Sequence, residues 1–376
     1  MRFFSLLIGF CLLGGAAAKA ASTPPMAMPE TWVPQDTFVL RTMPRLPPVD
    51  ARDQAYEAWS AYQVSGDTRW LGRALSGLKD TPEHSHRLIK ARVLQAMHRF
   101  DEAVALLSAV VDEGHSDLEA RLLLASIHLA QGKPGDALKV CSREAASQPA
   151  SLMLDFCLGL AESRQGQAKG AFQRLKKRRG AVAALPAAQQ QWAYGILAEL
   201  ADQQGQPDAL QWYARALVVD AENLYLRRVV AEYLHRQGRW TALQQLTADG
   251  RDQPQLALWH RLASQALGQA SYEYQSGLQQ QMLEAERRQD PLDASMLSRY
   301  ALWIENQPEK ALRYAQQNWA GQKTPEDARL LLAAATRAGE QAVVASVFQW
   351  VDAHSLRDSR LEVYRQSFPR QSGDSS

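Results

Sequence analysis

The sequence predicts an all-α protein in which helical hairpins repeat along the chain as a solenoid. Apolar residues recur at intervals of three and four positions, and Gly or Pro interrupts these runs at regular intervals, which is typical of successive amphipathic helices. No hairpin turn joins two alternating runs, since the one Asp-Gly pair, Asp249-Gly250, lies between helical segments. Small residues also return about every 34 positions, so the helices are expected to form repeating pairs.

Alanine and glycine carry this repeat. Two antiparallel helices approach closely only where their crossing point carries little side chain, so we expect these small residues at contacts between helices. The interval is constant in the first part of the chain and one position shorter further on, with one short insertion around 185–190. The recurring positions are Ala91, Ala125 and Gly159; Ala103, Ala137 and Ala171; Gly132 and Gly166; Ala198 and Ala231; Gly205 and Gly238; and Ala209 and Ala242.

Segment 1–20 has the pattern of a signal peptide. Arg2 is followed by the apolar stretch 3–13 and then by Ala18-Lys19-Ala20, which fits an A-x-A cleavage site. A membrane-spanning helix needs about 20 apolar residues, and Lys19 interrupts this segment too early. A lipoprotein signal acylated at Cys11 is the alternative, but Phe10 stands where a small residue is needed. We therefore expect cleavage near Ala20, a bacterial periplasmic location and no membrane span in the mature chain.

Three further regions are expected after the signal. Segment 21–50 holds seven of the 17 prolines and should form an extended arm, because proline does not propagate a helix. Residues 51–354 should form the repeat array, most clearly over 84–249. Residues 355–376 form a terminal segment whose polar tail is expected to fray.

Composition and motifs argue against several functional classes. The net charge is +2, and removal of residues 1–20 leaves 40 basic and 40 acidic side chains, so we expect no nucleic-acid partner. The chain has no H-E-x-x-H, G-x-S-x-G, Walker A or G-x-G-x-x-G motif. His84 and His86 are two apart and face different ways on a helix, which favours polar residues at a helix start over a metal site. We expect no catalytic site, cofactor or metal.

Two cysteines remain after the signal, and their positions predict a disulfide. Cys141 lies late in one helix and Cys157 early in the next, and Pro149 turns the chain between them. Both lie about two helical turns from that turn, so adjacent antiparallel helices bring them level. Two buried thiols in contact are the alternative.

The repeat resembles the tetratricopeptide repeat, whose period is also about 34 residues. The matching segments are LLLASIHLAQGKPGDALKVCSREAASQP (122–149) and LAELADQQGQPDALQWYARALVVDAEN (197–223). In the second segment, Ala209, Tyr213 and Ala216 stand at the three core positions of the family's second helix. The resemblance implies a right-handed superhelix of about eight to nine helix pairs. TWVPQDTFVLRTMP and NWAGQKTPEDARLLLAAATRAGE further resemble exported proteobacterial members, for which no activity is implied.

The resemblance also implies a concave groove, lined by fixed positions of each first helix. Transferred to this chain, the groove residues are Leu88, Arg92, Leu122, Ser126, Phe156, Leu160, Arg164, Glu199, Arg228 and Glu232, with Asp202 and Arg236 adding charge. Such a groove would suit a peptide with apolar anchors and a mixed-charge flank. Because LEARLLLASIHLA is apolar nearly all round, its apolar members could equally belong to the core.

These observations favour a non-enzymatic scaffold that binds an unidentified protein or peptide of the cell envelope. A factor for envelope polysaccharide or cell-wall assembly is one alternative, in which scattered tryptophans would contact glycans, although core packing explains them better. A hydrolase with an unrecognised site is the other alternative.

Overall fold

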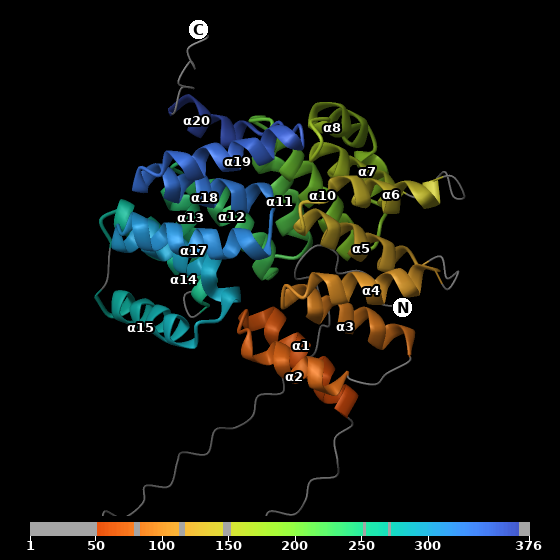
Figure 1. The fold of residues 1–376 in the computed structure, drawn as a ribbon, viewed down its shortest axis with the longest axis horizontal. Helices are drawn as coiled ribbons and strands as arrows, with labels where there is room; N and C mark the ends of the chain where they lie inside the picture. Colours follow the sequence, from red (N-terminus) through yellow and green to blue (C-terminus); the bar gives the residue numbers. More distant parts are fainter. Residues whose placement is uncertain are drawn as a thin grey trace, which may run out of the picture.

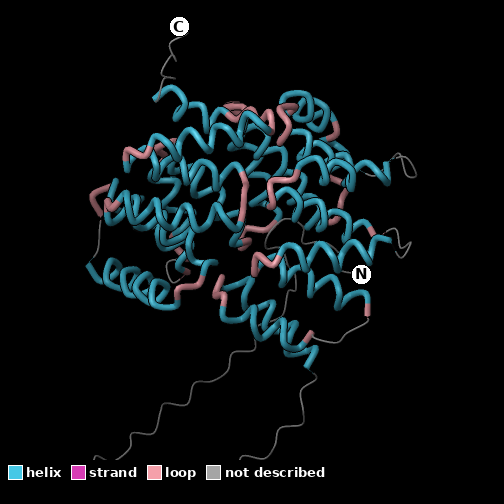
Figure 2. The backbone as a smooth tube through the Cα atoms, in the orientation of Figure 1, coloured by secondary structure: helices cyan, strands magenta, loops and turns pink. Residues whose placement is uncertain are grey.

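The computed structural model describes residues 51–78, 83–112, 117–145, 152–250, 253–269 and 272–367. The predicted signal peptide, the proline-rich arm and the polar tail from 368 lie outside these ranges. Every regular element within them is a helix, as Figure 2 shows, so the all-α prediction is confirmed. None of the described helices is both long and apolar enough to span a bilayer.

Successive helices pair as antiparallel hairpins, and nine hairpins follow one another in the described ranges. They are α1 (Ala51–Ser65) with α2 (Arg69–Gly77), α3 (His84–Ala96) with α4 (Phe100–Asp112), α5 (Leu118–Ala130) with α6 (Pro134–Ala145), α7 (Leu152–Ser163) with α8 (Ala168–Lys177), α10 (Ala187–Gln203) with α11 (Ala209–Val219), α12 (Leu224–Arg236) with α13 (Trp240–Thr247), α14 (Pro254–Ala266) with α15 (Tyr272–Arg288), α16 (Ala294–Tyr300) with α17 (Pro308–Gly321), and α18 (Pro325–Ala338) with α19 (Gln341–Ala353).

Four shorter or terminal elements complete the description: the one-turn helix α9 (Arg179–Val182), the 3-10 turn η1 (Pro291–Asp293), the π-helical turn η2 (Ala301–Glu305) and a last helix, α20 (Ser359–Ser367). Helix α20 was not anticipated in the terminal segment, and it packs against α18 and α10. Its buried Leu361 anchors it to the body of the protein.

The recurring small residues lie where helices cross. Ala91, Ala103 and Ala137 are completely buried in the main hydrophobic core. Gly159 shows why the position must be small, because a Cβ atom there would lie 2.6 Å from a methyl carbon of Leu175 on the paired helix. Such tight contacts let each hairpin nest against the next, and no hairpin has to bury its apolar face alone.

The solenoid turns back on itself, so that its last hairpins contact its early ones. Figure 1 shows the blue helices α18–α20 next to the green part of the chain, where α20 contacts α10. The backbone N–H of Lys323, in the α17–α18 loop, donates to the carbonyl oxygen of Ala130 at the end of α5, at 2.8 Å. At the opposite edge, Thr68 donates to Asp290 at 3.2 Å, which joins the first hairpin to η1. The described chain therefore closes into a ring.

Two hydrophobic cores meet in this ring without merging. The larger core extends from Leu88 to Tyr300, and a separate core covers Ala301 to Leu361. A third, smaller cluster holds the first hairpin against α3. The C-terminal hairpins thus have a hydrophobic core of their own.

Candidate functional site

The ring encloses a cavity of about 640 Å³, within the size range of typical ligand sites. One wall is formed by the first helices of successive hairpins, α5, α7, α10 and α12. The opposite wall comes from α14, α16, α18 and α20, and the end of α1 closes one side. The cavity therefore occupies the concave side of the solenoid.

Six residues of the predicted groove line this cavity: Ser126, Leu160, Arg164, Glu199, Arg228 and Glu232. Asp202 and Arg236 line it as well. Arg164, in the turn directly after α7, forms an ion pair with Glu199 of α10, and Arg236 of α12 donates to Asp202 of α10 at 2.5 Å. Neighbouring first helices are thus connected through their concave-side charges.

The other predicted groove residues lie elsewhere. Leu122 and Phe156 are 1% and 0% exposed in the main core, so they are core residues and not part of the cavity wall. Arg92 forms an ion pair with Glu119 of the next first helix instead of reaching the cavity. Leu88 is also buried in the main core. The helices α5 and α7 are apolar on most sides, so family position alone did not separate their buried faces from the concave face.

The opposite wall contributes charged residues that the sequence reasoning missed. Arg299 on α16 donates to Glu232 of α12 at 3.0 Å and to Glu326 of α18 at 2.6 Å. Glu326 also accepts from Arg228, and Arg329 pairs with Glu232. Arg299, Glu232 and Arg329 are buried, whereas Arg228 and Glu326 are half-buried. The groove charges of α12 are therefore satisfied by residues of α16 and α18.

The network continues to the end of the described chain. Arg360 of α20 lies 3.2 Å from the carboxylate of Asp202 and donates to the buried Asp358 at 2.6 Å. Buried charges need such partners because an unpaired ion in the interior costs several kcal/mol. One set of ion pairs therefore links α10 and α12 to α20, and a second set links α12 to α16 and α18.

The pKa values of two adjacent carboxyl groups of α18, Glu326 and Asp327, are shifted in opposite directions. Burial opposes ionisation of Glu326, but the guanidinium groups of Arg228 and Arg299 outweigh it and lower the pKa of that carboxyl to about 2. Burial and the neighbouring Glu326 raise the pKa of Asp327. Asp327 serves mainly as a helix cap, since it accepts from the backbone N–H of Thr324 while its own N–H donates to the Thr324 hydroxyl.

Some lining groups retain hydrogen-bonding capacity. The Nε1 of Trp192 and the Nε of Arg299 are buried with no hydrogen-bond partner among the described residues. Both side chains are more than nine-tenths buried and line the cavity. Apolar lining by Leu160, Ile196 and Leu258 accompanies them. The cavity thus combines hydrogen-bond donors and paired charges with apolar surface on both walls.

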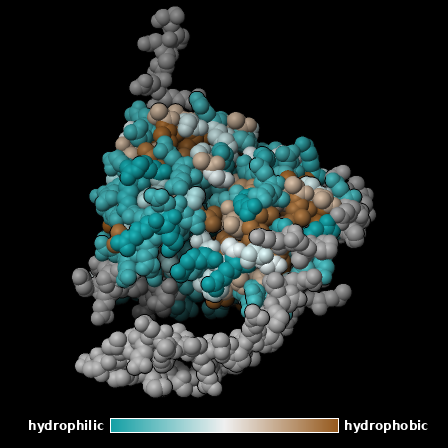
Figure 3. Space-filling view, turned by 60° about the horizontal axis from the view of Figure 1, so that its bottom comes forward, coloured by the Kyte–Doolittle hydropathy of each residue, from teal (hydrophilic) through white to brown (hydrophobic). Residues whose placement is uncertain are grey.

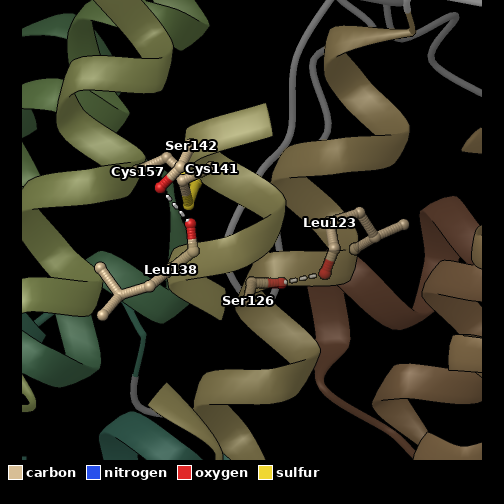
Figure 4. The surroundings of a disulfide bond; sticks show 6 residues. All are labelled: Leu123, Ser126, Leu138, Cys141, Ser142 and Cys157. Carbon is tan, nitrogen blue, oxygen red and sulfur yellow. Dashed lines mark hydrogen bonds between the residues drawn. A yellow bond between two sulfur atoms is a disulfide. The ribbon is translucent and has the colours of Figure 1, made fainter. Parts of the chain in front are cut away.

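The two cysteines do not line the cavity. In Figure 4, Cys141 of α6 and Cys157 of α7 meet between the two helices. Their sulfur atoms are 2.02 Å apart and their Cα atoms 5.8 Å apart, which is disulfide geometry. Both residues are buried in the main core, so the pair ties one hairpin to the next.

Other sequence features have structural explanations. Trp192, Trp212 and Trp259 are buried in the main core, as the core interpretation favoured. In the basic run Lys176-Lys177-Arg178-Arg179, Lys176 pairs with Asp208 and Arg178 with Asp155. No group of three possible metal ligands occurs among the described residues. The face drawn in Figure 3 is mainly hydrophilic, with smaller hydrophobic areas between.

Comparison with known proteins agrees with this architecture. Residues 91–153 match a family model described as tetratricopeptide repeat. The crystal structure of the APC/C hetero-tetramer Cut9-Hcn1 superposes with a TM-score of 0.50 at 13% identity, covering 79% of this chain and 59% of that one, less than two thirds of its length. The crystal structure of yeast Tom70 gives a TM-score of 0.33 at 12% identity over 84% and 85% of the two chains. No curated protein matches the sequence.

Proposed function

We propose that this chain, whose residues 91–153 match the tetratricopeptide repeat, is a non-catalytic scaffold that binds a segment of another protein in its central cavity. The observation that carries this proposal is the convergence of four successive first helices on one cavity. Repeat solenoids use their concave surfaces for binding in this way. The mixture of paired charges and apolar lining suits a peptide segment that presents both polar and apolar side chains.

We further propose that the protein acts in the bacterial periplasm and that its partner belongs to the cell envelope. The charged start, apolar stretch and A-x-A site within residues 1–20 support export. The bonded arrangement of Cys141 and Cys157 supports an oxidising compartment, because such pairs persist there and are rare in the cytosol.

A cavity-filling variant tests the binding site. Gly195 of α10 lines the cavity, and an added Cβ atom would meet nothing within 4 Å, so Gly195→Leu fills the cavity without a clash at the helix. Gly170 of α8 is exposed and equally open, so Gly170→Leu is the matched control. Both changes replace a helical glycine and should alter helix stability similarly.

The measurement is crosslinking in cells followed by capture from an envelope extract. We expect the wild-type chain and Gly170→Leu to capture the same partner, and Gly195→Leu to lose it by at least about tenfold, which corresponds to about 1.4 kcal/mol. Equal capture by all three chains would place the partner outside the cavity, and a chain that captures no specific partner would contradict the scaffold function.

A further inference from the structure

We propose that the ring opens and closes along one polar seam, and that a partner reaches the cavity only in the open form; the second part rests on the proposed function. The seam is the contact between the turns after α5, α7 and α10 (130–132, 163–166 and 202–205) and the C-terminal segment 322–360.

Polar contacts cross the seam at several points, beside the ring of Trp350, which lies against Gly132. Lys323 donates its backbone N–H to Ala130, and the Gln203 amide donates to the carbonyl oxygen of Arg357 at 2.8 Å. The ion pair of Arg360 with Asp202 crosses it as well. Hydrogen bonds of this kind contribute only about 1 kcal/mol each, since water replaces them when they break.

Hydrophobic burial, in contrast, lies on either side of the seam. The core of the C-terminal hairpins, from Ala301 to Leu361, is separate from the main core. Burial of apolar surface is the dominant stabilising term in proteins. Each side therefore keeps its own core when the seam parts, and opening should require much less free energy than unfolding.

The solenoid architecture permits such a movement. Repeat arrays flex by small rotations between neighbouring units, which add up over several hairpins. No single hinge is needed, because the hairpins from α12 to α17 connect the two sides of the seam along the chain.

The closed ring also explains why opening is needed. Glu326 covers Arg228, and Arg329 and Arg299 cover Glu232, so the concave charges of α12 already have partners within the chain. An incoming segment must replace these partners before it can contact α12. The C-terminal hairpins thus act as a gate over the groove.

Hydrogen exchange in the unmodified chain is the first test. The amide of Lys323 is protected by a bond across the seam, whereas the amides of Ile196 and Leu331 lie inside helices on either side of it. We expect Lys323 to exchange at least about a hundredfold faster than both, because seam opening has a lower free energy than global unfolding. Exchange of all three amides at the global unfolding rate would overturn the proposal.

A disulfide across the seam is the second test. A Cβ atom at Gly205 would lie 3.8 Å from the Cβ of Ser359, which is the usual separation in a disulfide. In the oxidised Gly205→Cys/Ser359→Cys chain we expect Lys323 exchange to slow at least about tenfold and to recover on reduction. Ser359→Cys alone, treated with the same reductant, controls for reduction of the native cysteine pair. Unchanged Lys323 exchange in the stapled chain would contradict gating at this seam.

Partner capture from the same stapled chain tests the second part of the proposal. We expect capture to fall at least about tenfold when the staple is oxidised and to return on reduction. Equal capture by oxidised and reduced chains would show that the partner does not pass through the seam. Hydrogen exchange needs no partner, so failure of the binding function and failure of the gate give different results. If the strained φ of +67° at residue 205 prevents folding of the variant, exchange in the unmodified chain still decides the question.

Discussion

Lys323 donates its backbone N–H to the carbonyl oxygen of Ala130 at 2.8 Å, and this single bond joins the loop before α18 to the end of α5. Ala130 is the last residue of α5, so its carbonyl has no intrahelical donor available. The C-terminal hairpins therefore satisfy a backbone group that an open solenoid would leave to water. Ring closure depends on such contacts at the turns of the early hairpins.

The turn after α7 gives a direct test of the seam's contribution to stability. Gly166 has a φ of +83°, and a Cβ atom there would lie 2.5 Å from the carbonyl oxygen of Ser355. Gly166→Ala should therefore lower the free energy of unfolding by about 1 kcal/mol through backbone strain. The clash with Ser355 should lower it by roughly a further 1–3 kcal/mol. Urea unfolding followed by circular dichroism measures the loss.

Gly268→Ala is the matched control for that variant. Gly268 has a φ of +69°, but a Cβ atom there would meet nothing within 4 Å. It should show the strain cost alone, about 1 kcal/mol. If both variants lose the same stability, the Gly166–Ser355 contact contributes nothing to the folded state.

The ion pairs of Glu326 predict a specific pH dependence. Its pKa falls from 4.5 to about 2 on folding, so its stabilising effect is fully present above pH 4.5 and is lost as the pH falls from 4.5 to 2. Glu326→Gln should destabilise the protein by about 1–3 kcal/mol at neutral pH, because Arg228 and Arg299 lose a charged acceptor. The difference from wild type should shrink progressively below pH 4.5.

Unfolding midpoints in urea between pH 3 and pH 7, roughly, measure this difference, and groups that titrate in both chains cancel. Glu309→Gln, at an exposed position of α17, is the control and should change stability by less than about 0.5 kcal/mol. If the stability difference between wild type and Glu326→Gln stays constant across this range, the ion pairs do not lower the pKa of Glu326.

The repeat was predictable because its physical cause is local and periodic. Each hairpin needs small residues at its crossing point, so Ala103, Ala137 and Ala171 return at equal intervals and are visible without a structure. The charged groove residues on α10 and α12 could be predicted in the same way, from their positions within each repeat. Glu199, Arg228 and Glu232 indeed line the cavity.

The closure of the ring was not predictable from this register. Arg299, Glu326 and Arg360 contact residues that are far away in the sequence, and no period connects them to α10 or α12. One available signal was the composition of α18, where Glu326, Asp327 and Arg329 immediately precede an apolar run of Leu and Ala. The prediction that Leu122 and Phe156 line the groove was wrong for a different reason. Their helices are apolar on most sides, so the sequence pattern does not indicate which face is concave.

The crossing between α5 and α6 provides a test of the repeat contacts. Ala137 is fully buried in the main core, so Ala137→Leu should overpack it at a cost of about 1–3 kcal/mol. Lys139→Leu adds a similar side chain to the exposed face of the same helix and should stay within about 0.5 kcal/mol of wild type. Thermal melts of both variants decide the point, and an unchanged melt of Ala137→Leu would contradict the observed packing.

The Cys141–Cys157 pair, with a sequence separation of 16, should stabilise the protein by closing a loop, at up to about 3 kcal/mol. Intact mass should therefore be lower than the reduced mass by two hydrogens, and reductant should lower the unfolding midpoint of the wild-type chain. The Cys141→Ala/Cys157→Ala chain is the control, because reductant should leave its midpoint unchanged. Two thiols that react with alkylating reagent in the unreduced, denatured protein would rule the bond out. They would also remove one support for an oxidising compartment, since small buried thiols occur equally in reducing ones.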